Sequence, residues 1–124
     1  MRLNQITQSV GHLLRSITFY RQLGLKLIVH DNDHYARFVC PEGDATFSVE
    51  LHSDVRPSGT VVYFECDDLD AEVMRLRALG ITIGEPIDQS WGWREAHLVD
   101  PDGHPICLFR AGSYRLDPPW RLRD

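Results

Sequence analysis

The feature that most constrains the fold of this chain is an internal repeat. Residues 9–27, SVGHLLRSITFYRQLGLKL, align without a gap to residues 65–83, ECDDLDAEVMRLRALGITI. The matched pairs lie 56 positions apart and include Leu13 with Leu69, Leu23 with Leu79 and Gly24 with Gly80. Self-similarity at a fixed spacing indicates one structural unit that is used twice.

Each half of the chain predicts a short strand, a helix that ends at a glycine, and three further strands. Apolar residues recur at helical spacing in both helices, and Gly24 supplies the left-handed residue that commonly closes a helix. In the second half Asp67 or Asp68 can cap the helix start. The expected strands are 3–10, 25–30, 34–41 and 45–52 in the first half, and 60–66, 81–88, 93–99 and 104–110 in the second.

These elements predict an α+β fold built from two tandem βαβββ modules. Module 1 covers about residues 3–53, module 2 about residues 59–110, and residues 111–124 form a C-terminal tail. A unit of about 55 residues has little interior of its own, so we expect the modules to form a single domain. The expected architecture is a curved mixed sheet with a cleft and with both helices on its outer face.

Strand alternation predicts which side chains face the cleft. In TFSVELH, Phe47 and Val49 point to the helix side, whereas Glu50 and His52 point the other way. The same reasoning for the other strands and the WGW segment gives the candidate ligand-binding residues Gln5, Tyr35, Glu50, Tyr63, Glu65, Trp91, Trp93 and His97. Simple solvent exposure of this polar face is the alternative.

Composition excludes several classes of function. A formal charge of -5 disfavours nucleic-acid binding, which needs clustered Lys and Arg. No apolar run approaches the roughly 18 residues of a membrane span, and the N-terminal residues lack the order of a signal peptide, so we expect no membrane contact and a cytoplasmic protein. The odd, widely spaced cysteines Cys40, Cys66 and Cys107 indicate buried free thiols.

Two short acidic segments have the composition of metal sites. HDNDH at 30–34 is interpreted as a hairpin turn, because Asn and Asp favour turns. DPDG at 100–103 lacks the further acidic positions of a calcium loop and is interpreted as the turn of a hairpin that ends the second module.

The chain resembles the vicinal oxygen chelate superfamily, which includes glyoxalase I, extradiol dioxygenases and bleomycin-resistance proteins. The similar segments are LNQITQSV with RSITFYRQLGLKL, the VEL strand, DDLDA with LRALGI, and WGWREAHLVDPDGHPICLF. The resemblance runs from about residue 3 to residue 110, and the last segment is closest to the bleomycin-binding members. It implies the two-module fold and leaves the activity open, because this fold carries unrelated chemistries.

The metal-dependent relatives hold one divalent ion at four strand positions. The resemblance places these positions at Gln5, Glu50, Val61 and Cys107. Valine cannot coordinate a metal, so the set is incomplete and no cofactor is expected; any metal would use Gln5 and Glu50. A relocated set of Gln5, Glu50, His52 and His97 is the alternative.

The incomplete metal set favours a metal-free small-molecule binding or resistance protein with an acidic, aromatic cleft. Trp91, Trp93, Tyr63 and Tyr35 would stack on the ligand, and Glu50 and Glu65 would supply negative charge. One alternative is a metal-dependent lyase, isomerase or dioxygenase. The other is a metal-free enzyme in which Glu50 is the catalytic base and Tyr63 or His52 the catalytic acid.

The resemblance also implies a homodimer, since members of the superfamily commonly pair modules across chains. The tail AGSYRLDPPWRLRD carries Trp120, which would be costly to expose. We therefore expect the tail to pack on its own module or on the partner's.

Overall fold

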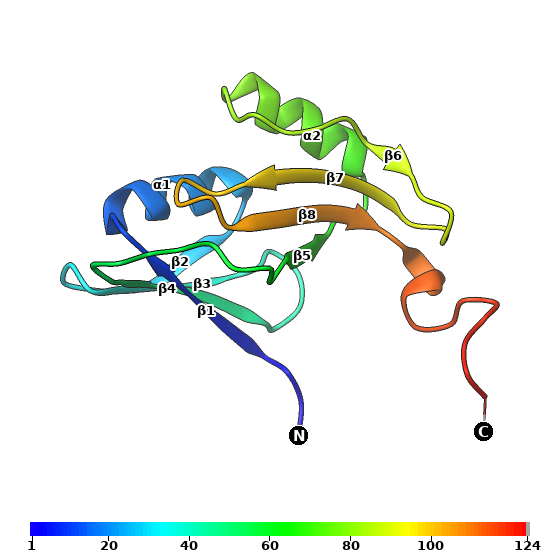
Figure 1. Ribbon diagram of the computed structural model, residues 1–124, viewed down its shortest axis with the longest axis horizontal. Helices are drawn as coiled ribbons and strands as arrows, with labels where there is room; N and C mark the ends of the chain where they lie inside the picture. Colours follow the sequence, from blue (N-terminus) through cyan, green and yellow to red (C-terminus); the bar gives the residue numbers. More distant parts are fainter. Residues whose placement is uncertain (124) are drawn as a thin grey trace. The chain divides into compact units, whose positions relative to one another are not determined.

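The computed structural model describes residues 1–123 and divides into two compact units (Figure 1). The first unit contains residues 1–58 together with residues 100–104, and the second contains residues 59–99 and 105–123. No helix in residues 1–123 is long and apolar enough to cross a bilayer.

The first unit is a four-stranded mixed sheet with one helix. Its elements are β1 (Gln5–Val10), α1 (Leu13–Leu23), β2 (Lys26–Asp31), β3 (Tyr35–Val39) and β4 (Thr46–Leu51). The strand order is β1-β4-β3-β2, with β1 parallel to β4 and the other pairs antiparallel. The helix covers one face, where Tyr20 packs its ring against Phe47 at 4.6 Å between ring centroids.

Helix α1 begins and ends where its sequence provides caps. The His12 side chain accepts a hydrogen bond from the backbone N–H of Arg15. Gly24 has φ 116°, and the Leu25 N–H bonds back to the carbonyl of Tyr20. This left-handed residue favours glycine, which confirms the predicted helix end.

The second unit repeats this plan. Its elements are β5 (Val62–Glu65), α2 (Leu69–Ala78), β6 (Ile87–Asp88), β7 (Arg94–Val99), β8 (Pro105–Arg110) and the short 3-10 helix η1 (Gly112–Arg115). The strand order is β5-β8-β7-β6, with β5 parallel to β8. Asp68 caps α2 by accepting from the N–H of Ala71, so the predicted acidic cap is confirmed.

The turn of the β7–β8 hairpin belongs to the first unit. Asp100 accepts the hydroxyl hydrogen of the buried Tyr20 at 2.7 Å, and it also accepts the backbone N–H groups of Asp102 and His104. Asp102 accepts from the Gly11 N–H and from Arg15. The acidic residues of the DPDG segment therefore fix a turn, as the sequence predicted.

The two-module α+β fold is confirmed, with two differences in detail. Each module builds its own four-stranded mixed sheet. Of the predicted strand 81–88 only Ile87 and Asp88 are extended and paired, while residues 81–86 form no regular element. This segment contains Gly84 and Pro86, which do not support a strand ladder.

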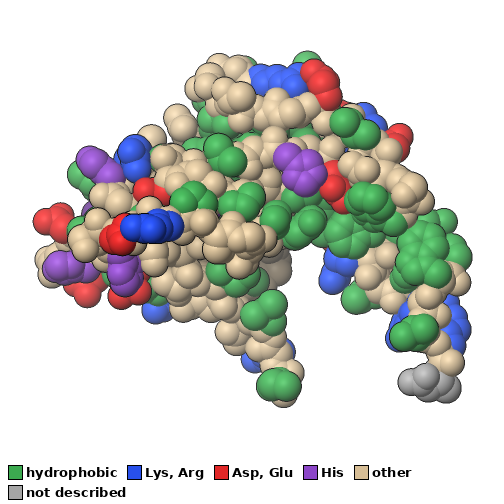
Figure 2. All heavy atoms as spheres, viewed as in Figure 1, with side chains coloured by type: hydrophobic (Ala, Val, Ile, Leu, Met, Phe, Trp, Pro, Cys, Tyr) green, Lys and Arg blue, Asp and Glu red, His purple; other side chains and the backbone are tan. Residues whose placement is uncertain are grey.

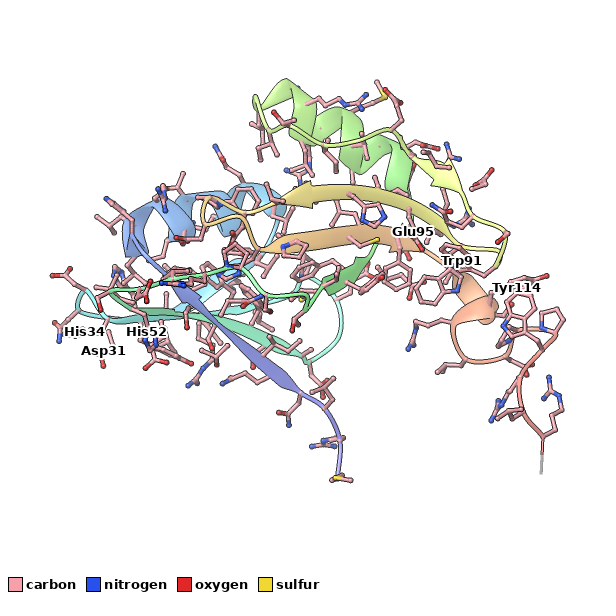
Figure 3. All side chains as sticks on the ribbon, in the orientation of Figure 1. Asp31, His34, His52, Trp91, Glu95 and Tyr114 are labelled. Carbon is pink, nitrogen blue, oxygen red and sulfur yellow. The ribbon has the colours of Figure 1, made fainter. Side chains whose placement is uncertain are left out.

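The HDNDH segment ends β2 with His30 and Asp31, and its residues 32–34 form the turn to β3. Asn32 adopts φ 48°, and the His34 N–H bonds to the carbonyl of Asp31 at 3.2 Å. The side chains of Asp31, His34 and His52 are labelled at this end of the first unit in Figure 3.

Candidate functional site

One face of the second sheet gathers aromatic, acidic and thiol side chains. Strand alternation directs Ala96, Leu98, Ile106 and Leu108 toward α2, where all four are buried. The opposite face therefore receives the alternate residues. These are Tyr63 and Glu65 of β5, Glu95 and His97 of β7, and Cys107 and Phe109 of β8.

Three rings form an aromatic surface on this face. Trp93 stacks on Phe109 with 4.5 Å between centroids and 17° between planes. Tyr63 meets both rings edge to face, at 6.1 Å from Trp93 and 5.7 Å from Phe109. Tyr63 remains 48% exposed, so part of this surface is open to solvent. We call Tyr63, Trp93 and Phe109 the aromatic surface.

A buried carboxylate lies beside the aromatic surface. Glu95 is 5% exposed, and its Oε2 accepts a hydrogen bond from Trp91 Nε1 at 3.0 Å. Its Oε1 lies 3.1 Å from His97 Nε2. The hydrogen-bond partners of Glu95 are thus an indole and an imidazole. The Glu95–His97 pair can therefore hold a net negative charge when His97 is neutral.

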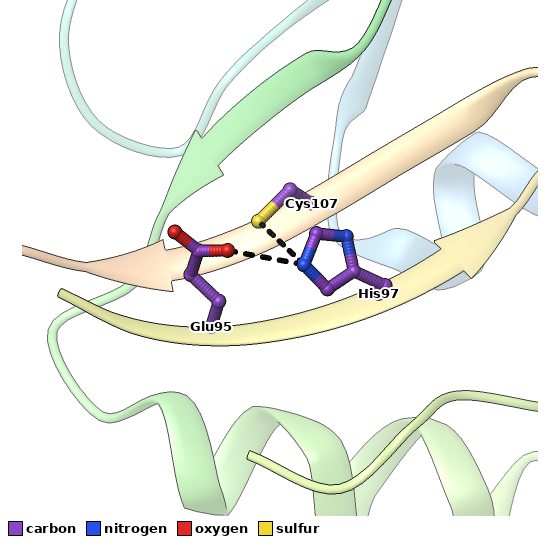
Figure 4. Close-up of side chains that lie close together, drawn as sticks. All are labelled: Glu95, His97 and Cys107. Atoms are coloured by element: carbon purple, nitrogen blue, oxygen red, sulfur yellow. Dashed lines mark hydrogen bonds and ion pairs between the residues drawn. The ribbon is translucent and has the colours of Figure 1, made fainter. Parts of the chain in front are cut away.

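Cys107 completes a compact cluster of donors with these two residues (Figure 4). Its Sγ lies 3.9 Å from His97 Nε2. Burial, followed by the negative charge of Glu95, raises the pKa of the Cys107 thiol to about 12. Without a metal the thiol is therefore protonated at neutral pH and is a poor nucleophile.

The loop before β7 is held by the C-terminal tail. Gly92 has φ 82°, and a side chain there would collide with the ring of Tyr114. Trp91, Glu95 and Tyr114 come from the loop, β7 and the tail and are labelled together in Figure 3. Trp120 meets Tyr114 edge to face at 6.0 Å but stays 58% exposed. The tail thus packs on its own module through Tyr114.

Glu65 holds the tail as well. Its Oε2 accepts the N–H groups of Ala111 and Gly112 at 3.1 and 3.2 Å, and Oε1 lies 3.4 Å from Arg115 Nε. The carboxylate that the sequence offered as a ligand anion is therefore committed to the start of η1. Figure 2 shows hydrophobic side chains grouped where β8 leads into this tail.

The corresponding face of the first sheet is polar and bonded to itself. Thr7 and Ser48 share a hydrogen bond of 2.6 Å, and Arg37 Nε donates to the Tyr35 hydroxyl at 2.9 Å. Burial acts to raise the pKa of Tyr35, but hydrogen bonds with Ser48 and Arg37 outweigh it and leave the pKa below its usual value. Gln5 accepts from Thr46 at 2.8 Å.

Glu50 and His52 lie near one end of this face. Their side chains approach to 3.6 Å, and each is about half exposed. His52 follows the last residue of β4 and is not within the strand.

The four positions that the resemblance assigns to a metal do not fit one ion. Glu50 pairs with Ser9, and Gln5 pairs with Thr46. Gln5 and Glu50 are therefore four residues apart along the ladder, roughly 13 Å, which is too far for a shared ion. Val61 offers no donor atom and precedes β5. In the alternative set, Gln5, Glu50 and His52 belong to the first unit and His97 to the second.

The structure thus brings together five residues that the sequence placed on the inner face or in the fourth metal position: Tyr63, Trp91, Trp93, His97 and Cys107. Glu95 and Phe109 were missed as site residues. Both could have been found from alternation, since Glu95 is two residues before His97 and Phe109 is two residues after Cys107.

Solved structures with the same fold include three proteins described as antibiotic-resistance or antibiotic-binding proteins. A bleomycin resistance determinant encoded on the transposon Tn5 has a TM-score of 0.75 and 23% identity, covering 89% of this chain and 98% of that one. A bleomycin-binding protein complexed with bleomycin has a TM-score of 0.74 and 23% identity, with the same coverage. TnmS3, an antibiotic-binding protein from Streptomyces sp. CB03234, has a TM-score of 0.76 and 22% identity, covering 90% and 96%.

At these identities the similarity establishes the fold alone. None of the curated proteins searched matches the chain significantly. The family model for the glyoxalase, bleomycin resistance and dioxygenase proteins matches residues 2–108. Since that match covers most of the sequence, the chain belongs to the Glyoxalase/Bleomycin resistance protein/Dioxygenase superfamily.

Proposed function

We propose that this protein binds and sequesters small aromatic molecules that carry a positive charge, with the face of the second sheet as the main contact. The observation that carries the proposal is the aromatic surface of Tyr63, Trp93 and Phe109, in which Tyr63 is 48% exposed, beside the buried Glu95. Flat rings can stack on or against this surface, and a cation gains from both the ring faces and the carboxylate.

The solved relatives support the same ligand class. One of them was crystallised as a complex with bleomycin, and another is an antibiotic-binding protein. Sequestration requires a complementary surface and no bond-breaking step. An antibiotic resistance role for this chain would follow from such binding.

The thiols of the second unit favour binding over covalent catalysis. Burial is the main cause that raises the pKa of Cys107 to about 12 and of Cys66 to about 11. A catalytic cysteine normally has a lowered pKa, because the thiolate is the nucleophile. These two residues are therefore poor candidates for a metal-free nucleophile.

The first unit keeps its own predicted contacts. Gln5, Tyr35 and Glu50 remain predicted ligand contacts, and His52 pairs with Glu50.

A homodimer also remains part of the proposal. Light scattering coupled to size-exclusion chromatography measures it directly, and a monomeric mass at micromolar concentration would refute it.

The test uses a matched pair of probes, the aromatic cation N-methylquinolinium and its neutral analogue 1-methylnaphthalene, together with bleomycin. We expect calorimetry to show tighter binding of the cation, because a desolvated cation on an aromatic face gains about 1–2 kcal/mol. Trp93→Ala should weaken binding about tenfold or more, and Glu95→Gln should remove most of the preference for the cation.

Trp120→Ala is the control, because that ring is exposed in the tail and outside the aromatic surface. Equal affinity of the Trp93→Ala variant and the native protein would contradict the proposal. So would binding of none of the three probes.

A further inference from the structure

We propose that Glu95, His97 and Cys107 form a site for a zinc-class divalent metal with one coordination position left open. One ligand atom from each residue lies within 4.8 Å of the other two. Strand β7 supplies Glu95 and His97 from alternate positions, and β8 supplies Cys107 directly opposite His97 in the antiparallel register.

The distances are close to those of tetrahedral coordination. With zinc bonds of about 2.0 Å to nitrogen or oxygen and about 2.3 Å to sulfur, the ligand atoms of a tetrahedron lie roughly 3.3 to 3.5 Å apart. His97 Nε2 is 3.1 Å from Glu95 Oε1 and 3.9 Å from Cys107 Sγ. All three ligand atoms lie within 4.8 Å of one another, so side-chain movements of about an ångström would bring them to one ion.

The donor set selects the metal. A thiolate, an imidazole and a carboxylate together suit zinc or cobalt(II), whereas magnesium and calcium require oxygen ligands. When His97 carries its hydrogen on Nε2, that hydrogen can be donated to either the carboxylate or the sulfur. A metal ion would satisfy all three donors at once.

The surroundings are those of a supported site. Trp91 Nε1 holds Oε2 of Glu95, which fixes the carboxylate and leaves Oε1 directed at His97. The His97 side chain is 59% exposed, so a water or a ligand atom can reach the fourth position. Three protein ligands with one open position are typical of zinc sites that act on a bound molecule.

The first unit provides an internal contrast. In the matching register its residues are Tyr35, Arg37 and Ser48, where the second unit has Glu95, His97 and Cys107. The Arg37 guanidinium puts a fixed positive charge where a metal would have to lie. The proposed site is therefore specific to the second unit. It shares only Cys107 with the four family positions.

The test is a titration of the reduced protein with cobalt(II), followed by absorbance. We expect one equivalent to produce a sulfur-to-cobalt charge-transfer band in the near ultraviolet and the visible bands of tetrahedral cobalt, and zinc to remove both. Cys107→Ser should abolish the charge-transfer band, and His97→Ala should weaken cobalt binding at least tenfold. Trp91→Phe should weaken it about tenfold through loss of the carboxylate support.

Cys66→Ser is the matched control and should leave the spectrum unchanged. Far-ultraviolet circular dichroism verifies that each variant is folded. The absence of a charge-transfer band with the native protein would overturn the proposal, as would a band that persists in Cys107→Ser. No organic ligand enters this titration, so its outcome is independent of the proposed binding function.

Discussion

The two units place different chemistry on matching positions of the same sheet plan. In both, the first strand is parallel to the last, and the last pairs with its antiparallel neighbour. When the strand registers of the two sheets are matched, five positions correspond: Thr7 to Tyr63, Ser48 to Cys107, Arg37 to His97, Tyr35 to Glu95 and Glu50 to Phe109. Two short hydroxyl side chains of the first unit, Thr7 and Ser48, thus correspond to a ring and a thiol in the second, and the exposed Glu50 corresponds to the buried ring of Phe109.

On the face of the first sheet the polar side chains hydrogen-bond to one another, whereas the face of the second sheet is suited to binding another molecule. In the first unit the hydroxyl pair Thr7 and Ser48 and the pair Arg37 and Tyr35 bond to each other. In the second unit the half-exposed Tyr63 is part of an aromatic surface beside a carboxylate with no lysine or arginine partner in the described ion pairs. Exposed rings beside such a charge favour binding of another molecule.

The largest expected contrast is in stability after substitution of Phe109 or Glu50, which occupy corresponding positions in the two sheets. Phe109 is buried between Tyr63 and Trp93, so Phe109→Ala should lower the free energy of unfolding by about 3–5 kcal/mol. Glu50→Ala, at the matching exposed position, should change it by about 0.5 kcal/mol or less. Urea unfolding measures both, and equal losses would break the comparison.

The next contrast concerns two glycines with similar backbone angles. Gly92 and Gly43 have φ of 82° and 78°, but only Gly92 is covered by Tyr114, while the space around Gly43 is open. Both alanine variants should lose about 1 kcal/mol from backbone strain, and Gly92→Ala should lose about 1–2 kcal/mol more. In a Tyr114→Ala background the two glycine variants should lose the same amount in thermal unfolding.

The cores should also differ in their response to alkali, because Tyr20 of α1 aligns with Leu76 of α2. Burial, supported by the charge of Asp100, raises the pKa of Tyr20 far above its usual value. The native state therefore keeps this proton after the unfolded state begins to lose it near pH 10. Stability from Tyr20 is complete below that pH and is lost as the pH rises.

Tyr20→Phe isolates this contribution. At pH 8 the variant should be about 1.5–3 kcal/mol less stable, since the hydrogen bond to Asp100 is lost. Above pH 10 the difference in free energy of unfolding between the native protein and the variant should narrow by up to about 1.4 kcal/mol per pH unit. A gap that stays constant from pH 8 to pH 11 in urea unfolding would contradict this account.

The smallest effect is expected at Thr7 and Tyr63. Thr7→Val removes the hydrogen bond to the buried Ser48 and should cost about 1 kcal/mol. Tyr63→Phe keeps the ring contacts and should change stability by about 0.5 kcal/mol or less. A larger loss for Tyr63→Phe would show that the second face depends on its hydroxyl.

The sequence predicted the fold well because repeat, periodicity and caps agree in it. The helix end at Gly24 and the cap at Asp68 follow from local rules and are observed. Residues 81–86 were expected to be extended but form no regular element, since Gly84 and Pro86 do not support a strand ladder.

The site was only partly predictable. Alternation correctly put Tyr63 and His97 on one face, but alternation cannot give the register between strands. The register of β1 with β4 places Gln5 and Glu50 four residues apart along the ladder. The register of β7 with β8 places His97 opposite Cys107. The sequence also gave no sign that Glu65 would hold the tail, because its partners are backbone N–H groups 46 and 47 residues away.

The most direct test of the central claim is an NMR titration of the isotope-labelled protein with N-methylquinolinium, following the indole N–H signals of Trp91, Trp93 and Trp120. If the second face binds aromatic cations, the Trp91 and Trp93 signals should shift and saturate together with amides of β5, β7 and β8, while Trp120 stays in place. Saturating shifts confined to β1, β3 and β4, or no shifts at all, would contradict the account.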